Sequence, residues 1–195
     1  LDETVNSLAR LVSIPSISTD GAHGAELDQS AAVVAQLAAE TGFPEVEILR
    51  PDSGYPAVMA SWTVDPKAST VLMLSHHDVQ PVNYRSEWKT DPWVLQEKDG
   101  RLFGRGAADD KGGVIAQITA VKAWAKTHGK PPVNVKLLIE GEEEIGSQNL
   151  LSLADQNRQR LHADALVVCD TENISVGLPS LTCSLRGVVT LRVTA

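Results

Sequence analysis

The 195-residue sequence predicts an α/β sandwich of three layers, in which helices cover both faces of a central, mostly parallel (mixed) sheet. Two observations predict this fold class. Segments whose apolar residues recur at helical spacing alternate along the chain with short, continuous apolar runs of strand length. Three of those runs also end directly in polar clusters, as buried strands do when they deliver side chains to the edge of a sheet.

Helices and strands can be placed from periodicity and breakers. Residues 2–12 form a predicted helix that Pro15 ends, and residues 26–40 form a second one that is followed by Gly42 and Pro44. Further helices are predicted from the glycine-rich turn 104–106 to about His128 and over 149–160, and residues 81–100 are predicted to be a long loop. The predicted strands are 46–49, 57–63, 70–74, 133–139, 163–168 and, near the end of the sequence, 188–193.

Charge and composition exclude several classes of protein. With 17 basic and 25 acidic residues the net charge is −8, which argues against a nucleic-acid partner but not against a cation. No apolar run reaches the 18 residues of a membrane span, so no membrane partner is expected. Two cysteines make no disulfide framework, which fits a reducing compartment, and a cytoplasmic location is expected.

The polar clusters at the strand ends predict a metal centre. His76 and Asp78 follow the strand at 70–74, Glu143 and Glu144 follow the one at 133–139, and Asp170 follows the one at 163–168. Asp109 and Asp110 come after a glycine-rich turn at a helix start. Two carboxylates about 4 Å apart repel by several kcal/mol, so they bind protons or a cation. One imidazole among carboxylates suits zinc or manganese, and four or more carboxylates suggest two ions.

Taken singly, these features have plainer interpretations. A His-x-Asp pair after a strand is usually a hydrogen-bonded surface pair, three consecutive glutamates are usually a solvated loop, and His77 has no evident partner and is expected at the surface. The glycine-rich turn has Asp109 where a dinucleotide-binding loop has its third glycine, and the sequence contains no P-loop. A nucleotide-binding module is therefore rejected.

Four motifs together resemble the co-catalytic metallopeptidases of family twenty, which include carnosinase-type dipeptidases, aminoacylase, acetylornithine deacetylase, succinyl-diaminopimelate desuccinylase and glutamate carboxypeptidase. The motifs agree in order and spacing, with 33 residues from His76 to Asp109, 35 from there to Glu144 and 26 more to Asp170. The matching segments are Ser75-His76-His77-Asp78-Val79-Gln80-Pro81, Trp88 with Asp91-Pro92-Trp93, Asp99-Gly100-Arg101-Leu102-Phe103-Gly104-Arg105-Gly106-Ala107-Ala108-Asp109-Asp110-Lys111-Gly112, Glu140-Gly141-Glu142-Glu143-Glu144-Ile145-Gly146-Ser147, and Asp170.

The resemblance implies a role for each residue of the motifs. It implies that His76 and Asp170 bind one ion, that Glu144 binds a second, and that Asp109 bridges the two. Asp78 would fix the orientation and tautomer of the histidine. Glu143 would be the general base that activates the attacking water. The resemblance also implies a cis peptide bond between Asp109 and Asp110. The cofactors would be two divalent ions, zinc in the first place, with manganese or cobalt as alternatives.

The sequence departs from the family pattern in two ways. The family has a fifth ligand, a histidine far downstream, and no histidine follows His162 here. The family also inserts a lid domain through which it dimerises. Residues 1–179 are therefore interpreted as the N-terminal part of the catalytic domain, and 180–195 as its end together with the first strand of the lid. A homodimer formed through that lid is expected.

The details of the motifs favour one branch of the family. His-x-Asp-Val-Gln-Pro and Glu-Gly-x-Glu-Glu-x-Gly-Ser are most similar to the dipeptidases, so the resemblance implies hydrolysis of a dipeptide or similar small amide. The alternatives are an N-acyl-amino-acid deacylase or desuccinylase, and a metal-binding relic without turnover. Because one metal ligand and the lid are missing, the isolated 195-residue chain is expected to be inactive.

Overall fold

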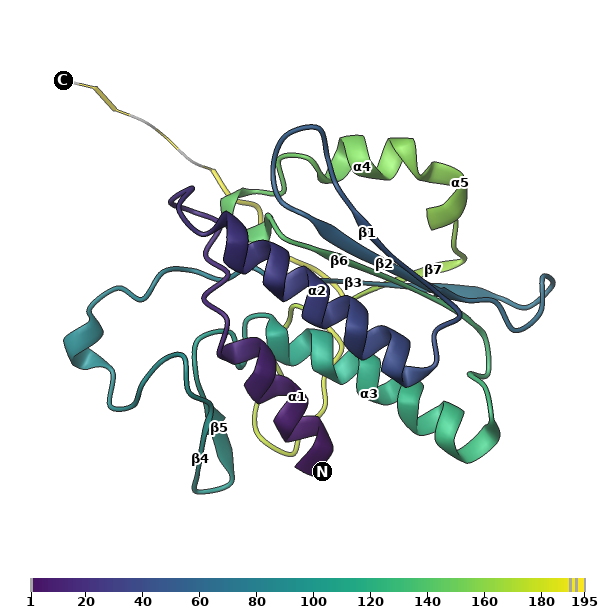
Figure 1. Ribbon diagram of the computed structural model, residues 1–195, viewed down its shortest axis with the longest axis horizontal. Helices are drawn as coiled ribbons and strands as arrows, with labels where there is room; N and C mark the ends of the chain where they lie inside the picture. Colours follow the sequence, from purple (N-terminus) through teal and green to yellow (C-terminus); the bar gives the residue numbers. More distant parts are fainter. Residues whose placement is uncertain (1, 190, 192, 195) are drawn as a thin grey trace.

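The computed structural model describes residues 2–189, 191, 193 and 194, and these form a three-layer α/β sandwich (Figure 1). The predicted fold class is confirmed. The helices are α1 (Asp2–Val12), α2 (Gly24–Thr41), α3 (Lys111–His128), α4 (Leu150–Gln156) and α5 (Arg158–Leu161), with 3-10 turns η1 (Arg85–Glu87) and η2 (Glu143–Ile145). The strands are β1 (Glu45–Leu49), β2 (Ala57–Trp62), β3 (Thr70–His76), β4 (Gln96–Lys98), β5 (Arg101–Phe103), β6 (Asn134–Glu140) and β7 (Ala165–Val168).

The central sheet is mixed, with the strand order β1-β2-β6-β3-β7. β2 runs antiparallel to both β1 and β6, whereas β3 runs parallel to both β6 and β7. The three parallel strands therefore end at one edge of the sheet, where the polar clusters follow them. β4 and β5 pair as a separate hairpin inside the predicted loop 81–100 and just beyond it.

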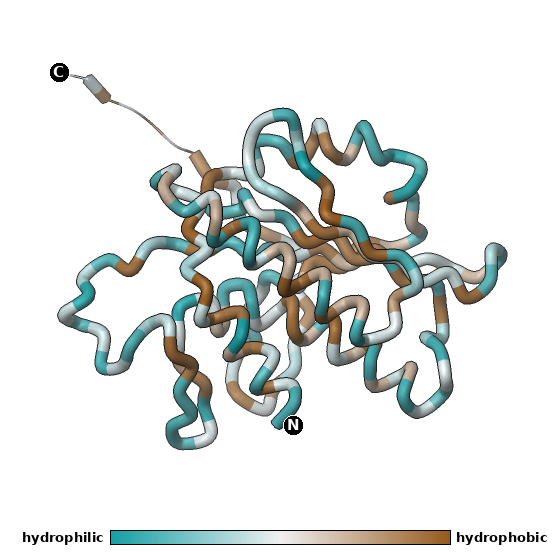
Figure 2. The backbone as a smooth tube through the Cα atoms, in the orientation of Figure 1, coloured by the Kyte–Doolittle hydropathy of each residue, from teal (hydrophilic) through white to brown (hydrophobic). Residues whose placement is uncertain are grey.

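Side-chain alternation along β6 explains how the sheet is covered on both faces. Leu137 and Ile139 pack into a core with α1, α2 and α3, whereas Leu138 between them faces a smaller core that includes Leu153 of α4. Alternate residues of a strand point to opposite faces, so this continuous apolar run is buried on both sides, as predicted. Each fully buried leucine contributes about 1.5–3 kcal/mol. Figure 2 shows the hydrophobic residues along the central strands, with hydrophilic residues at loop tips.

The structure confirms the predicted end of α2 and corrects two other predicted elements. α2 ends where Gly42 takes a left-handed conformation, with φ of 104°, and its N–H caps the last carbonyls. The helix predicted over 149–160 is divided into α4 and α5. The strand predicted over 188–193 is not found: its described residues pair with no other strand and are exposed, while residues 190 and 192 lie outside the described part.

Candidate metal centre

His76 is the centre of the predicted site and lies at the last position of β3. Its side chain is 1% exposed, and the ring contacts carboxylates through both nitrogens. Nδ1 lies 3.1 Å from the backbone oxygen of Asp78 and 3.2 Å from its Oδ1. Because both of these oxygens accept hydrogen bonds, the Nδ1 atom carries the proton, and Nε2 is the nitrogen that can donate a lone pair to a metal ion.

Three carboxylates converge on Nε2 of His76. Nε2 lies 3.1 Å from Oδ1 of Asp109, 3.8 Å from Oδ2 of Asp170 and 3.9 Å from Oε2 of Glu143. Zinc bonds to nitrogen and oxygen are about 2.0–2.2 Å long, so ligand atoms around a shared ion lie roughly 3–3.6 Å apart. The metal-free spacing is thus close to that of a coordinated set, and the three residues come from three separate segments of the chain.

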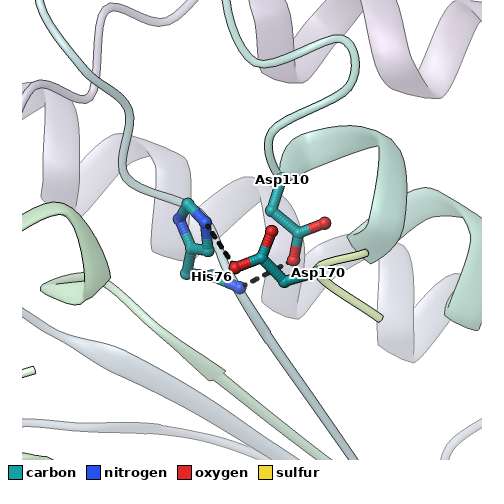
Figure 3. A group of neighbouring side chains, drawn as sticks. All are labelled: His76, Asp110 and Asp170. Atoms are coloured by element: carbon teal, nitrogen blue, oxygen red, sulfur yellow. Dashed lines mark hydrogen bonds and ion pairs between the residues drawn. The ribbon is translucent and has the colours of Figure 1, made fainter. Parts of the chain in front are cut away.

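Asp110 joins this cluster although the sequence did not indicate it as a ligand. One ligating atom each of His76, Asp110 and Asp170 lie within 4.8 Å of one another (Figure 3). The Asp110 side chain is fully buried: Oδ2 accepts the backbone N–H of His76 at 3.2 Å, and Oδ1 has no hydrogen-bond partner. In the sequence, the only indication that Asp110 belongs to the site is its position next to Asp109. The peptide bond between these two residues is cis, as the resemblance implied.

The electrostatics of the cluster show a surplus of negative charge. Burial alone would lower the pKa of His76, but the hydrogen bond and charge of Asp78, with the charges of Asp110 and Asp170, raise it to about 10. Burial raises the pKa of Asp110 to about 7. In the absence of a metal ion the site therefore retains protons, and a divalent cation would displace them. A buried carboxylate oxygen without a partner and a donor set of one imidazole and several carboxylates fit zinc or a similar ion.

The three consecutive glutamates point to three different partners. Glu142 is buried, and its carboxylate accepts the backbone N–H of Tyr55 at 2.9 Å and both donors of Asn149 at 3.0 Å, which is a structural role. Glu143 turns towards His76, as given above. Burial raises the pKa of the Glu143 carboxylate, and the charges of Asp170 and Glu144 add to that rise. A raised pKa suits a group that must accept and release a proton.

Glu144 does not contact His76 and is held by Gln80 instead. Its Oε1 accepts the backbone N–H of Gln80 at 3.0 Å, and Oε2 accepts the Gln80 side-chain amide at 2.6 Å. Burial raises the pKa of Glu144, and the nearby charge of Asp109 raises it further, which places the two carboxylates in one electrostatic environment. Gln80 is thus a residue of the site for which the sequence offered only its place in the first motif.

Two further residues of the motifs, His77 and Lys111, are buried and have structural roles. His77 is fully buried, not at the surface, because its Nε2–H donates to the carbonyl of Pro56 at 2.9 Å, and burial lowers its pKa to about 4. Lys111, the residue after Asp110, is also fully buried. Its ammonium donates to the carbonyls of Leu11 and Ile14 at 2.8 and 2.7 Å and so ties the start of α3 to the end of α1.

The fold is that of an α/β protein, and its donor set is a carboxylate-rich candidate metal centre. Residues 72–182 match the model of the peptidase family M20/M25/M40, and the chain belongs to that family. Among the helices of residues 2–189, none is long and apolar enough to cross a membrane.

Curated relatives and solved structures agree with this assignment. The chain is 36% identical over 207 residues to the Cys-Gly metallodipeptidase dug1 of Schizosaccharomyces pombe, covering 99% of this chain and 43% of the relative. It is 42% identical over 134 residues to the Beta-Ala-His dipeptidase of Homo sapiens, covering 68% of this chain and 26% of the relative. It thus spans less than half the length of these relatives.

Two solved structures share the fold at similar identity. Human carnosine dipeptidase 1 superposes with a TM-score of 0.79 at 36% identity, covering 87% of this chain and 38% of the other. The M20 family metallo-carboxypeptidase Sso-CP2 of Sulfolobus solfataricus superposes with a TM-score of 0.80 at 34% identity, covering 89% and 38%. The structural likeness therefore extends over nearly all of the present chain.

Proposed function

We propose that the protein hydrolyses the amide bond of a small peptide, most simply a dipeptide, with the help of divalent metal ions. One observation carries the proposal: Nε2 of the buried His76 faces Asp109, Asp170 and Glu143, while Nδ1 is held by Asp78. The names of the relatives, which are dipeptidases for Cys-Gly and Beta-Ala-His, support the substrate class.

In this proposal His76 and Asp170 would hold one ion, Glu144 would hold a second, and Asp109 would contribute to both. The chemistry that zinc, manganese or cobalt supplies in such sites is Lewis acidity towards water and towards the scissile carbonyl. Asp78 keeps the imidazole in the tautomer that leaves Nε2 free. Glu143 takes a proton at its carboxylate from the attacking water and returns it to the leaving amine.

The proposal includes a consequence for the isolated chain. His76, Asp109 and Asp170 provide three protein ligands for one ion, whereas the second is left with Asp109 and Glu144, and two carboxylates hold a divalent ion weakly. We expect at most one tightly bound ion per chain and no dipeptide hydrolysis above background. The proposal also includes a homodimer built through a lid domain. It further includes a cytoplasmic location, which the free thiols of Cys169 and Cys183 support.

The experiment compares Glu143→Gln with the unaltered protein, in a longer chain that carries the complete ligand set. Loss of a general base lowers turnover by about 10²–10⁴-fold, and the metal content measured by elemental analysis stays the same. The substrates are Cys-Gly, Beta-Ala-His and N-acetyl and N-succinyl amino acids. Hydrolysis of the acylated amino acids alone would identify a deacylase or desuccinylase, and metal binding without any turnover would identify a non-catalytic relic.

The isolated chain is tested separately with zinc or cobalt and the same substrates. Two tightly bound ions per chain together with rapid hydrolysis would show that the ligand set proposed here is incomplete. Full turnover of the metal-replete Glu143→Gln variant would remove Glu143 from the mechanism.

A further inference from the structure

The Asp78 carboxylate joins more parts of the centre than the histidine alone. Besides the contact of Oδ1 with Nδ1 of His76, Oδ1 accepts the backbone N–H of Glu143 at 3.3 Å, and Oδ2 accepts that of Glu144 at 3.1 Å. One buried side chain therefore sets both the imidazole at the end of β3 and the backbone of η2. A group that fixes the orientation of the Asp78 carboxylate therefore influences the positions of the His76 ring and of the η2 backbone.

Ser18 is that group, and it comes from a segment outside all the motifs. Its hydroxyl donates to Oδ2 of Asp78 at 2.6 Å, a distance typical of a strong hydrogen bond from a hydroxyl to a carboxylate. The side chain is 3% exposed, so no bulk water can replace it. The Asp χ2 angle has a broad energy profile, so the carboxylate plane is set by its donors and not by its own rotamer.

The backbone around Ser18 is itself anchored to the residues that follow β3. The N–H of Val79 donates to the carbonyl of Ser16 at 2.9 Å, and Ile17 forms a parallel bridge with Val79. Ser16 also donates its hydroxyl to the carbonyl of His77 at 2.7 Å. Ser16 and Ser18 are thus two buried hydroxyls of one extended segment, and only Ser18 reaches the Asp78 carboxylate.

We propose that Ser18 is a positioning residue of the metal centre, which fixes the plane of the Asp78 carboxylate and through it the His76 ring and the Glu143–Glu144 backbone. The significance for metal binding rests on the proposed function. The coupling from Ser18 to Glu143 and Glu144 does not, because it exists in the metal-free structure. Loss of an outer hydrogen-bond partner of this kind typically lowers metal affinity by about 10–100-fold.

The test uses Ser18→Ala, with Ser13→Ala as the control, since Ser13 lies in the same segment and its exposed hydroxyl donates to the carbonyl of Arg10 at 2.8 Å. In metal-free protein, hydrogen exchange measured by NMR should be about tenfold faster at the Glu143 and Glu144 amides in Ser18→Ala and unchanged in Ser13→Ala. Cobalt titration, followed by visible absorption, should show roughly tenfold weaker binding by Ser18→Ala alone, near the lower end of the range for outer partners. Ser18→Thr, which retains a hydroxyl, should restore both values.

The outcomes separate this inference from the proposed function. Exchange rates and a cobalt affinity of Ser18→Ala that equal those of the unaltered protein and of Ser13→Ala would overturn the role of Ser18. Faster exchange in Ser18→Ala, together with no cobalt binding even by an unaltered longer chain that carries the complete ligand set, would support the coupling and overturn the metal centre. If circular dichroism shows that Ser18→Ala does not fold, Ser18→Cys replaces it, because a thiol is a weaker hydrogen-bond donor than a hydroxyl. An unchanged exchange rate of the Glu144 amide in Ser18→Cys would then contradict the proposal.

Discussion

The substitution Gly113→Ala tests how closely α3 packs against the candidate metal centre, because the structure leaves no space for a side chain at this position. Gly113 lies in the first turn of α3, and a Cβ atom on it would be 1.9 Å from Oδ1 of Asp110 and 2.7 Å from the carbonyl oxygen of Cys169. Ordinary contact begins at 3.4 Å, so Gly113→Ala must turn the Asp110 carboxylate away and move the α3 backbone about 0.7 Å from Cys169.

The size of the effect follows from two opposing contributions. Overpacking of a buried position costs about 1–3 kcal/mol, and the better helix propensity of alanine returns up to about 1 kcal/mol. Since a main-chain oxygen cannot rotate away as a side chain can, we expect the upper part of the range and a net loss of about 1–2 kcal/mol of unfolding free energy. Cobalt affinity should fall as well, because the displaced neighbours include Asp110 and the segment leading to Asp170.

The unfolding free energy is measured by urea unfolding in EDTA, followed by circular dichroism. The cobalt affinity is measured by titration. Gly24→Ala is the control, since Gly24 begins α2 and a Cβ there meets nothing within 4 Å. That variant should be neutral or more stable by up to about 1 kcal/mol. A Gly113→Ala protein as stable as the unaltered one, with the same cobalt affinity, would refute this account of the contact between α3 and Cys169, which follows β7.

Three further predictions concern the core, the partly buried amine of Lys136 and the metal. Leu137→Ala should lower the unfolding free energy by about 3–5 kcal/mol in urea titrations, whereas the 79% exposed Leu151 should tolerate alanine within about 0.5 kcal/mol; equal losses would contradict the assigned core. Burial lowers the pKa of Lys136, so the folded state binds fewer protons and the unfolding free energy rises with pH through the range between the lowered and the ordinary pKa. In urea titrations at stepped pH, the unfolding free energy of Lys136→Met should rise less with pH than that of the unaltered protein. An equal rise in both proteins would contradict the lowered pKa of Lys136. Zinc or cobalt at 100 times its Kd should add about 2.7 kcal/mol to the unfolding free energy, measured by urea unfolding and reversed by EDTA; no change on metal addition would exclude a site confined to the folded state.

The sequence predicts most of the layers of this fold, and it fails where burial depends on a neighbour. The helices α1 and α2 and the strands β3 and β6 have clear apolar periods and clear breakers, so their existence could be predicted. His77 could not be recognised as buried, because its partner, the Pro56 carbonyl, belongs to a loop that precedes it by 21 residues. The residues of β7 are apolar, yet they are all exposed in the described chain, since β7 lies at the edge of the sheet.

The sequence points to the residues of the candidate site whose side-chain chemistry is distinctive, and it gives no signal for those that take part only through their position. His76, Asp109, Glu143 and Asp170 follow strands and turns in recognisable motifs, and the structure brings them together. Ser18 carries no such signal, because a serine after a proline-containing turn is common and its carboxylate partner is 60 residues away. The different partners of the three glutamates also depend on the path of η2, which the sequence does not indicate.

The contacts of the segment between α1 and α2 bear on where the working unit of this protein starts. All the catalytic motifs lie at or beyond residue 75, so a shortened protein that begins near β1 would retain every one of them. Such a protein would nevertheless lack the donor to Asp78, the carbonyls that receive the Lys111 ammonium and the bridge to Val79. Residues 11–18 therefore brace the candidate metal centre from outside its motifs, and a change to this segment is expected to alter the geometry of the centre.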